Sequence, residues 1–233
     1  MESEKNLLDL LSDFATALPV SYDVESVLVE LMQSVTALLE LTGSGVTLVD
    51  GQRMHCVMAL NDVSGQLERV QEEHQAGPCV ESVRTGTPVF VRDVAENVGV
   101  WPEYAAAAQR LGMVAVAGIP MRLGDSTIGA LNLYGSQPRD WSDEDMHVAS
   151  VLASMATGYI VNASKLQQQE QLTVQLQTAL DSRVVIEQAK GMTARDRGVS
   201  VDDAFEHIRG HARQHNAPLR RVAEAIVTMG LRV

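Results

Sequence analysis

One stretch constrains this chain more than any other feature. Between Ser142 and Gly191 there is no proline, and Gly158 is the sole glycine. The stretch opens with Ser142-Asp143-Glu144-Asp145, a capping-box pattern in which the serine hydroxyl caps a free backbone N–H and acids fill the first turn. Leucines then recur four residues apart, so we favour one long connecting helix over a flexible glutamine-rich linker. The chain therefore divides into a module before this helix and a module at its end.

The two modules differ in charge. The whole chain has 18 Lys and Arg against 30 Asp and Glu, a formal charge of −12. Residues 1–163 have 8 basic against 22 acidic side chains, a net −14, whereas residues 164–233 have 10 against 8, a net +2. This asymmetry indicates an acidic domain followed by a mildly basic module with a different partner. The net charge of the whole chain, taken alone, would exclude electrostatic binding of a nucleic acid. The net charge of the second module, taken separately, does not exclude it.

Composition also limits the compartment. Two cysteines are too few for a disulfide scaffold and fit a reducing cytoplasm. Residues 1–6 are acidic where a secretory signal would be basic and then apolar. The uncharged run from Val148 to Ser164 is shorter than the about 20 apolar residues of a membrane span and contains several polar residues, so we interpret it as a buried helix. We therefore predict a cytoplasmic protein that does not enter the membrane.

The first module mixes helices and strands. Apolar residues have helical spacing at 7–18, and again from Asp23 to Leu39. The period then changes to two at 46–49 and 54–60, which flank Asp50-Gly51, a hairpin signal. Further strands are predicted at 88–91, 114–121 and 127–134, the last two joined by a turn at Gly124-Asp125-Ser126, and a charged helix is predicted at 64–75.

The second module is predicted to be a three-helix unit over about 172–230. Its first helix is the end of the long helix. Ser200-Val201-Asp202-Asp203 is another capping box, and it leads into an apolar stripe of Val201, Ala204, Phe205, Ile208 and Ala212. Asn216-Ala217-Pro218 starts the last helix, which is expected to bury Leu219, Val222, Ala223 and Ile226.

Two parts of the chain resemble known families. Residues 179–192, ALDSRVVIEQAKGM, are similar to the ANTAR domain, a bacterial RNA-binding module of transcription-antitermination regulators, and the likeness continues to Ile226-Val227. The first ~160 residues resemble a GAF domain, through Gly77-Pro78-Cys79, Arg84-Thr85-Gly86, Asp93, Trp101-Pro102, Ile119-Pro120, Ile128–Tyr134 and Trp141–Asp145. The resemblance implies an α+β sensory domain with a central antiparallel sheet and flanking helices, joined by a long helix to an all-α three-helix domain.

The resemblance also implies boundaries and a ligand class. We expect a GAF-like domain at 1–163, a coiled-coil-like connecting helix at 164–178 and an ANTAR domain at 179–233. GAF domains that bind cyclic nucleotides have a lysine after a signature asparagine, whereas Asn132 is followed by Leu133 here. The ligand of the first domain, if it has one, therefore stays open.

Six basic side chains are the predicted RNA-binding residues: Arg183, Lys190, Arg209, Arg213, Arg220 and Arg221. Arg183 and Lys190 lie seven apart with Glu187 between them, and this spacing alone favours an exposed salt-bridged face. The ANTAR resemblance instead implies contacts with RNA phosphates and loop bases. Arg220 and Arg221 lie in the first turns of a helix, where cations oppose the helix dipole, so a bound anion would explain them.

Three other groups of residues are interpreted as structural or surface residues, with no catalytic or ligand-binding role. His207, His211 and His215 recur every four residues, but no cysteine or catalytic glutamate completes a known metal-binding spacing, so we predict surface histidines and no metal. Phe205 lies on the apolar stripe and is interpreted as core rather than as a base-stacking ring. Cys56 and Cys79 lack a CxxC motif and an attached base, and are interpreted as buried structural cysteines.

The sequence thus predicts a homodimeric, non-enzymatic regulator without a cofactor. Its GAF domain would control an ANTAR domain that binds RNA hairpins in nascent transcripts, and the homodimer follows because a narrow apolar seam on an isolated helix needs a partner helix. Two alternatives stay open. A three-helix unit with a basic edge also fits a helix-turn-helix DNA-binding regulator, and some GAF domains are thiol redox enzymes.

Overall fold

The computed structural model describes residues 24–233, so the helix predicted at 7–18 lies outside the described residues. The chain forms two compact units, the first ending at Ser164 and the second running from Lys165 to Val233. The first unit contains the strands β1 (Gly43–Asp50), β2 (Arg53–Ala59), β3 (Val89–Val91), β4 (Ala115–Leu123) and β5 (Ser126–Gly135). Its helices are α2 (Val24–Leu38), α3 (Asp62–His74), α4 (Pro78–Thr85), the 3-10 helix η1 (Val94–Asn97) and α5 (Pro102–Arg110). α6 (Asp143–Arg197) continues into the second unit, followed by α7 (Val201–Gln214) and α8 (Leu219–Met229).

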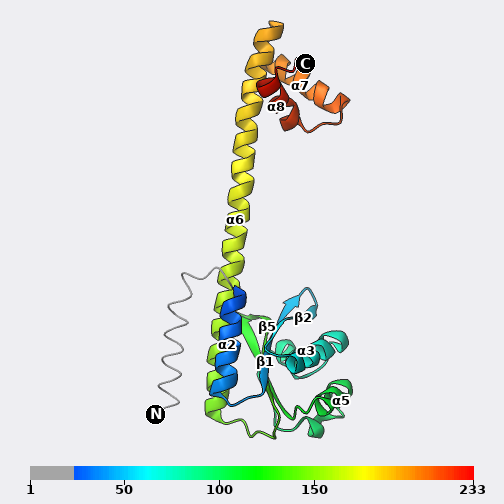
Figure 1. The fold of residues 1–233 in the computed structure, drawn as a ribbon, viewed down its shortest axis with the longest axis vertical. Coiled ribbons are helices and arrows are strands. Elements are labelled where there is room, and N and C mark those ends of the chain that lie inside the picture. The colour runs from blue at the N-terminus through cyan, green and yellow to red at the C-terminus, as the bar shows by residue number, and fades with distance from the viewer. Residues whose placement is uncertain (1–23) are drawn as a thin grey trace. The chain divides into compact units, whose positions relative to one another are not determined.

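A five-stranded antiparallel sheet of order β2-β1-β5-β4-β3 forms the centre of the first unit (Figure 1). Every predicted strand is present, and both predicted hairpins close through a left-handed glycine, Gly51 at φ 60° and Gly124 at φ 61°. The predicted α+β fold with flanking helices is therefore confirmed. α4 and α5 were not predicted, although each begins with a proline in its first turn, a known helix-start signal.

The sheet packs on both faces, because side chains alternate along each strand. On one face, α2 and the first part of α6 enclose a core that includes Leu31, Val35, Leu131, Leu133 and Leu152. On the other face, α3 and α5 pack around Leu67, Tyr104 and Tyr134. Figure 1 shows these layers, with α2 and α6 on one side of the sheet and α3 and α5 on the other.

α6 confirms the prediction of one long helix. The capping box forms as expected: the Asp145 N–H donates to Ser142 Oγ, and the Ser142 N–H donates to Asp145 Oδ2, each at 3.1 Å. The run from Val148 to Ser164 contributes buried residues to the core of the first unit. None of the helices in the described residues has both the length and the hydrophobicity that a bilayer span requires.

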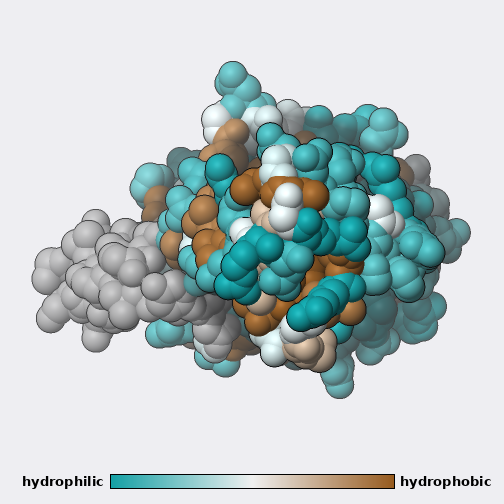
Figure 2. Space-filling view, turned by 90° about the horizontal axis from the view of Figure 1, so that it is seen from above, coloured by the Kyte–Doolittle hydropathy of each residue, from teal (hydrophilic) through white to brown (hydrophobic). Residues whose placement is uncertain are grey.

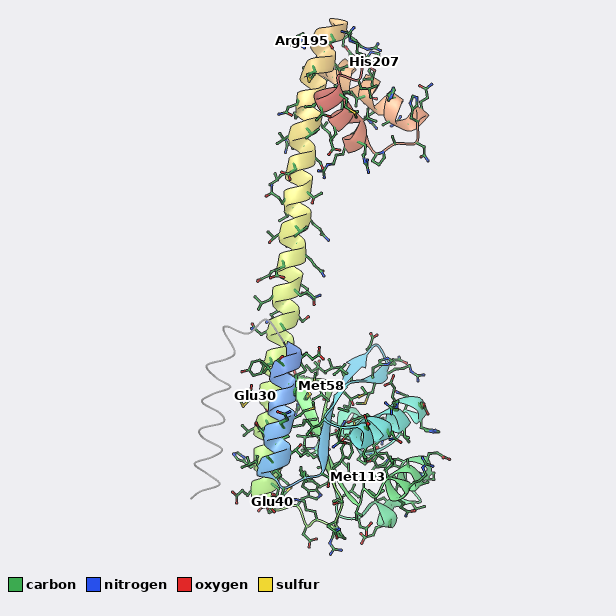
Figure 3. All side chains as sticks on the ribbon, in the orientation of Figure 1. Glu30, Glu40, Met58, Met113, Arg195 and His207 are labelled. Carbon is green, nitrogen blue, oxygen red and sulfur yellow. The ribbon has the colours of Figure 1, made fainter. Side chains whose placement is uncertain are left out.

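The middle of α6 presents apolar side chains that have no packing partner among the described residues. The side chains along this stretch project away from the helix (Figure 3). The exposed fractions lie between 55% and 59% for Leu172, Leu176, Leu180 and Val184. We call these four residues the apolar seam.

The second unit packs the end of α6 against α7 and α8. Its core consists of Ala189, Ile208, Ala212, Val222, Ala223 and Ile226. Ser200 caps α7 as predicted, since its Oγ accepts from the Asp203 N–H at 3.1 Å. Val201 was predicted on the buried stripe, and this is wrong: it is 47% exposed, because it lies in the first turn of α7, before the helix reaches the core.

The face of the molecule seen in Figure 2 is mostly hydrophilic, with small hydrophobic patches.

Candidate functional site

The turn between α7 and α8 is a Schellman motif. The Ala217 N–H donates to the Ala212 carbonyl at 2.9 Å, and the Asn216 N–H donates to the Arg213 carbonyl at 3.2 Å. Asn216 has φ 49°, a left-handed conformation that asparagine tolerates better than most residues. Pro218 then precedes the first residue of α8. The segment interpreted as a helix start is therefore both the end of one helix and the start of the next.

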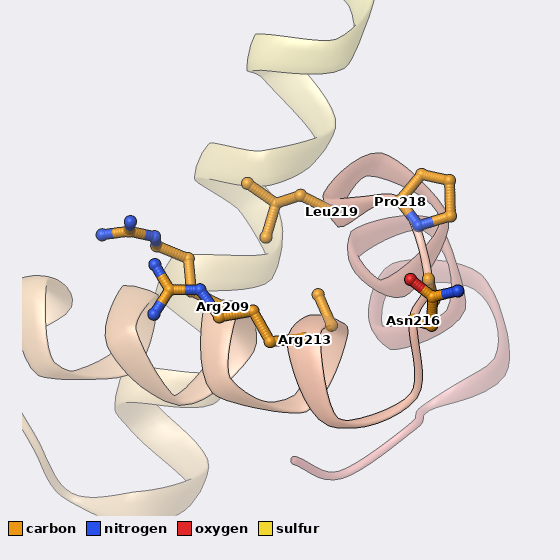
Figure 4. Close-up of a pocket in the computed structure, with 7 residues that line it drawn as sticks. Arg209, Arg213, Asn216, Pro218 and Leu219 are labelled. Atoms are coloured by element: carbon orange, nitrogen blue, oxygen red, sulfur yellow. The ribbon is translucent and has the colours of Figure 1, made fainter.

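An open groove of about 500 Å³ lies at this turn and is lined by Arg209, Ala212, Arg213, Asn216, Ala217, Pro218 and Leu219. We call it the α7–α8 groove. Arg209 and Arg213 are four residues apart on α7 and so share one face of that helix; in Figure 4 they are seen on one side of the groove, and Asn216 and Pro218 on the other. The groove thus combines an apolar lining with two cations at one end and an amide at the other.

Lys190 and Arg209, two of the predicted RNA-binding residues, meet at one aromatic ring. The Lys190 Nζ lies 5.3 Å and the Arg209 guanidinium carbon 5.6 Å from the centre of the Phe205 ring, both within cation–π range. Phe205 is half-buried and belongs to this cluster, so its assignment to the apolar core is corrected. The physical reason is that its ring packs against two basic side chains from α6 and α7.

Several predicted cations are engaged with carboxylates of their own helices. Lys190 Nζ lies 3.0 Å from Glu187 Oε1 and its side chain is only 15% exposed. Arg209 Nη1 lies 2.7 Å from Glu206 Oε1, and Arg220 Nε lies 2.8 Å from Glu224 Oε1. These pairs leave the cations partly neutralised by their neighbours.

Arg183, Arg213 and Arg221 are exposed and form no ion pair with any residue in the described part of the chain. The structure therefore brings Arg213, Arg209 and Lys190 together, through the groove and the Phe205 ring. It does not place Arg183 or Arg221 in that cluster. The three exposed arginines keep their full charge for an external anion.

Two of the three histidines, His211 and His215, stack ring against ring. The rings of His211 and His215 lie 4.1 Å apart at their centres, and His215 Nδ1 lies 2.9 Å from the His211 carbonyl oxygen. Within residues 24–233, no three His, Cys, Asp or Glu side chains are grouped so that they could hold a metal ion.

The first unit contains a buried polar cluster that the sequence analysis missed. Glu68 on α3 is 1% exposed and accepts hydrogen bonds from Asn132 Nδ2, the Tyr134 hydroxyl and Thr47 Oγ1, each at 2.8 Å. Gly45 makes the close approach of α3 possible, because a Cβ there would lie 2.2 Å from Glu68 Oε1. Burial raises the pKa of the Glu68 carboxyl above its usual value, and the three hydrogen bonds oppose that rise.

Two buried atoms of this region have no hydrogen-bond partner in the described structure, Asn132 Oδ1 and Gln71 Nε2. The other end of the Gln71 amide accepts from the Cys79 N–H at 2.9 Å. A buried unpaired acceptor and a buried unpaired donor are costly, and such atoms require an explanation, for example a bound water or ion. The polar cluster is therefore the candidate sensing site of the first unit.

Both cysteine thiols lie near this cluster and neither is activated. Burial raises the pKa of Cys56 to about 12 and the pKa of Cys79 well above its usual value, and the Glu68 charge adds to both shifts. The thiolate is the reactive form of cysteine, so neither side chain is a ready nucleophile near neutral pH. Cys79 is buried as predicted, whereas Cys56 on β2 is half-buried.

A family model for the GAF domain matches residues 21–160, more than half of the chain. The chain belongs to the GAF domain family. A second family model, for the ANTAR domain, matches residues 174–227. The protein thus has a GAF sensor domain followed by a C-terminal ANTAR domain, the architecture of a sensor-controlled regulator. No curated protein matches the chain.

Solved structures support the fold of the GAF domain. A domain of a protein named as a two-component sensor histidine kinase, from Sinorhizobium meliloti 1021, has 19% identity and a TM-score of 0.55, with 65% of this chain and 99% of that chain covered. The GAF domain of an Acinetobacter phosphoenolpyruvate-protein phosphotransferase has 19% identity and a TM-score of 0.52 over 70% and 97%. The free methionine-R-sulfoxide reductase of Neisseria meningitidis, solved with its substrate, has 14% identity and a TM-score of 0.51 over 69% and 91%. At these identities the likeness shows the fold alone.

The family matches place the two candidate sites in different domains. The polar cluster around Glu68 lies in the GAF domain, and all six predicted RNA-binding residues lie within the ANTAR match. The boundaries at 1–163, 164–178 and 179–233 stay predictions.

Proposed function

We propose that this protein is a cytoplasmic, homodimeric transcription-antitermination regulator that binds RNA hairpins through its ANTAR domain under control of its GAF domain. One observation carries the proposal: the ANTAR match coincides with the one part of the sequence that has a positive net charge, 9 Lys and Arg against 6 Asp and Glu from Arg183 onward. The GAF part is strongly acidic and would repel RNA. Affinity therefore has to come from a few cations on α6, α7 and α8.

The proposal describes a regulator that is not an enzyme. The raised pKa values of both thiols argue against thiol chemistry, since a reductase that works through cysteine needs a thiolate. The likeness to a methionine sulfoxide reductase concerns the fold and does not transfer its activity.

Dimerisation is the second part of the proposal. The apolar seam on α6 exposes four aliphatic side chains at helical spacing. A second copy of the same helix would cover the seam as in a coiled coil, so we place the dimer contact there.

An electrophoretic comparison tests RNA binding. The full-length protein is titrated against a pool of RNA hairpins with randomised loops, and against duplex DNA of matched length at the same salt concentration. We expect retardation of a subset of hairpins at protein concentrations that leave the duplex free. Equal or tighter binding of the duplex would overturn the proposal in favour of the helix-turn-helix alternative.

A further inference from the structure

We infer that the α7–α8 groove holds one unpaired base of the RNA loop, with Arg209 and Arg213 on the adjacent phosphate and the Asn216 amide on the edge of the base. The inference rests on the proposed function and assigns a single-nucleotide subsite within it. Three separate features of the groove support it: its lining, its charge and its one unusual backbone position.

The lining suits a flat, weakly polar group. Two alanines, Pro218 and Leu219 contribute the apolar surface, and the volume of about 500 Å³ falls in the range of roughly 300–1,000 Å³ typical of small-molecule sites. Sequence-specific RNA recognition mostly uses loop bases that are splayed out, stacked against side chains and hydrogen-bonded on their edges. An apolar groove beside polar groups is the kind of surface such a base requires.

The charge at one end of the groove calls for an anion. Glu206 pairs with Arg209, which also lies over the Phe205 ring, so this guanidinium is held in place from two sides. Arg213 follows four residues later on the same helix face, lines the same groove and has no ion pair with a described residue. Because Glu206 already compensates Arg209, the charge of Arg213 is the one left for an external anion, and guanidinium groups match the geometry of phosphate. A nucleotide bound by its base would bring such a phosphate.

Asn216 supplies the third feature. Glycine satisfies the left-handed position of a Schellman turn without steric cost, so the backbone alone does not require asparagine. Asparagine adds an exposed amide at the groove, and no hydrogen bond within the described structure occupies it. An amide offers a donor and an acceptor together, which is the pattern needed to read one edge of a base.

The test combines a protein variant with a change in the RNA. Asn216→Gly removes the amide and keeps the left-handed turn, so the fold is retained. A hairpin selected from the randomised pool is prepared with an abasic site at each loop position in turn. For the wild-type protein we expect one abasic position to weaken binding roughly 10- to 100-fold, the range of one stacked base. For Asn216→Gly we expect weaker binding of the intact hairpin and a much smaller further loss at that same position.

Arg213→Ala tests the phosphate contact, with Arg195→Ala as the matched control. Arg195 is exposed on α6 and does not line the groove. We expect Arg213→Ala to reduce the slope of log affinity against log salt by about 0.7, the value for one single-strand phosphate contact, and Arg195→Ala to leave the slope unchanged. Circular dichroism checks that each variant is folded.

The outcomes separate the subsite from the proposed function. If the wild-type protein binds no hairpin, both fail. If it binds hairpins but the Asn216→Gly and abasic losses simply add at every loop position, the subsite is overturned and the proposed function stands. If Asn216→Gly and Arg213→Ala bind hairpins normally but lose terminator read-through in purified transcription, the groove serves a protein partner and the subsite is likewise overturned.

Discussion

Lys190 forms both an ion pair and a cation–π contact, so its substitution changes more than one interaction. Its ammonium group contacts Glu187 and the Phe205 ring, so Lys190→Ala would uncover the ring as well as remove a charge. Lys190→Gln keeps most of the stem and is the sharper variant. We expect it to weaken binding to all hairpins alike and to reduce the salt slope by about 0.7, because one phosphate contact is lost.

The companion variant is Glu187→Gln. Removal of the carboxylate 3.0 Å from Lys190 Nζ frees the ammonium group, so hairpin binding should tighten slightly. Both variants are measured by filter binding over a salt series. A folded Lys190→Gln protein with unchanged affinity and unchanged slope would show that Lys190 is not at the RNA site.

Glu68 makes a prediction about stability and pH. Its folded-state pKa is raised above the unfolded value of 4.5, so the folded protein keeps a proton that the unfolded chain releases. The contribution of Glu68 is therefore complete below about pH 4.5 and falls as the pH rises toward the raised pKa. We expect Glu68→Gln, which does not titrate, to lessen this fall when urea unfolding is followed as the pH is raised above 4.5. Glu73→Gln, an exposed position on the same helix, is the control and should follow the wild type.

At the scale of elements, the apolar seam of α6 carries the dimer prediction. Leu172→Glu with Leu176→Glu places four like charges across the proposed helix pair, so light scattering should report a monomer. Gln171→Glu with Gln175→Glu adds the same charges on exposed neighbouring positions of α6 and should leave the dimer intact. If the leucine double variant stays dimeric, the interface lies elsewhere, among the GAF helices.

Taking the molecule as a whole, α6 is the one element within residues 24–233 that contributes to both the GAF core and the ANTAR core. If a ligand in the GAF domain shifts α6, that shift would be transmitted along the helix to the ANTAR domain. An insertion of three residues near Gln168 turns everything downstream by about 300° around the helix axis, whereas seven residues nearly restore the original face. We expect a read-through reporter to lose regulation with three inserted residues and to keep it with seven. Equal regulation by both variants would favour a flexible tether.

Features that depend on local signals could be predicted from the amino-acid sequence. The capping boxes at Ser142 and Ser200, the turns at Asp50-Gly51 and Gly124, and the uninterrupted course of α6 each follow from residues a few positions apart. Such signals act through backbone hydrogen bonds and dihedral preferences, which need no distant partner. The GAF and ANTAR resemblances follow the same chain order and agree with the family matches.

Contacts between residues that are distant in the sequence became known only from the folded structure. Thr47, Glu68, Asn132 and Tyr134 come from three separate elements, and nothing in their local sequence shows that a buried carboxyl gathers the other three. α4 and α5 have only eight and nine residues, so each offers about two turns of helical pattern, too short a run to identify a helix by periodicity. Phe205 was interpreted as a core residue, but its ring lies against a basic side chain, because α6 places Lys190 beside it. These outcomes depend on packing between elements, which no short-range pattern encodes.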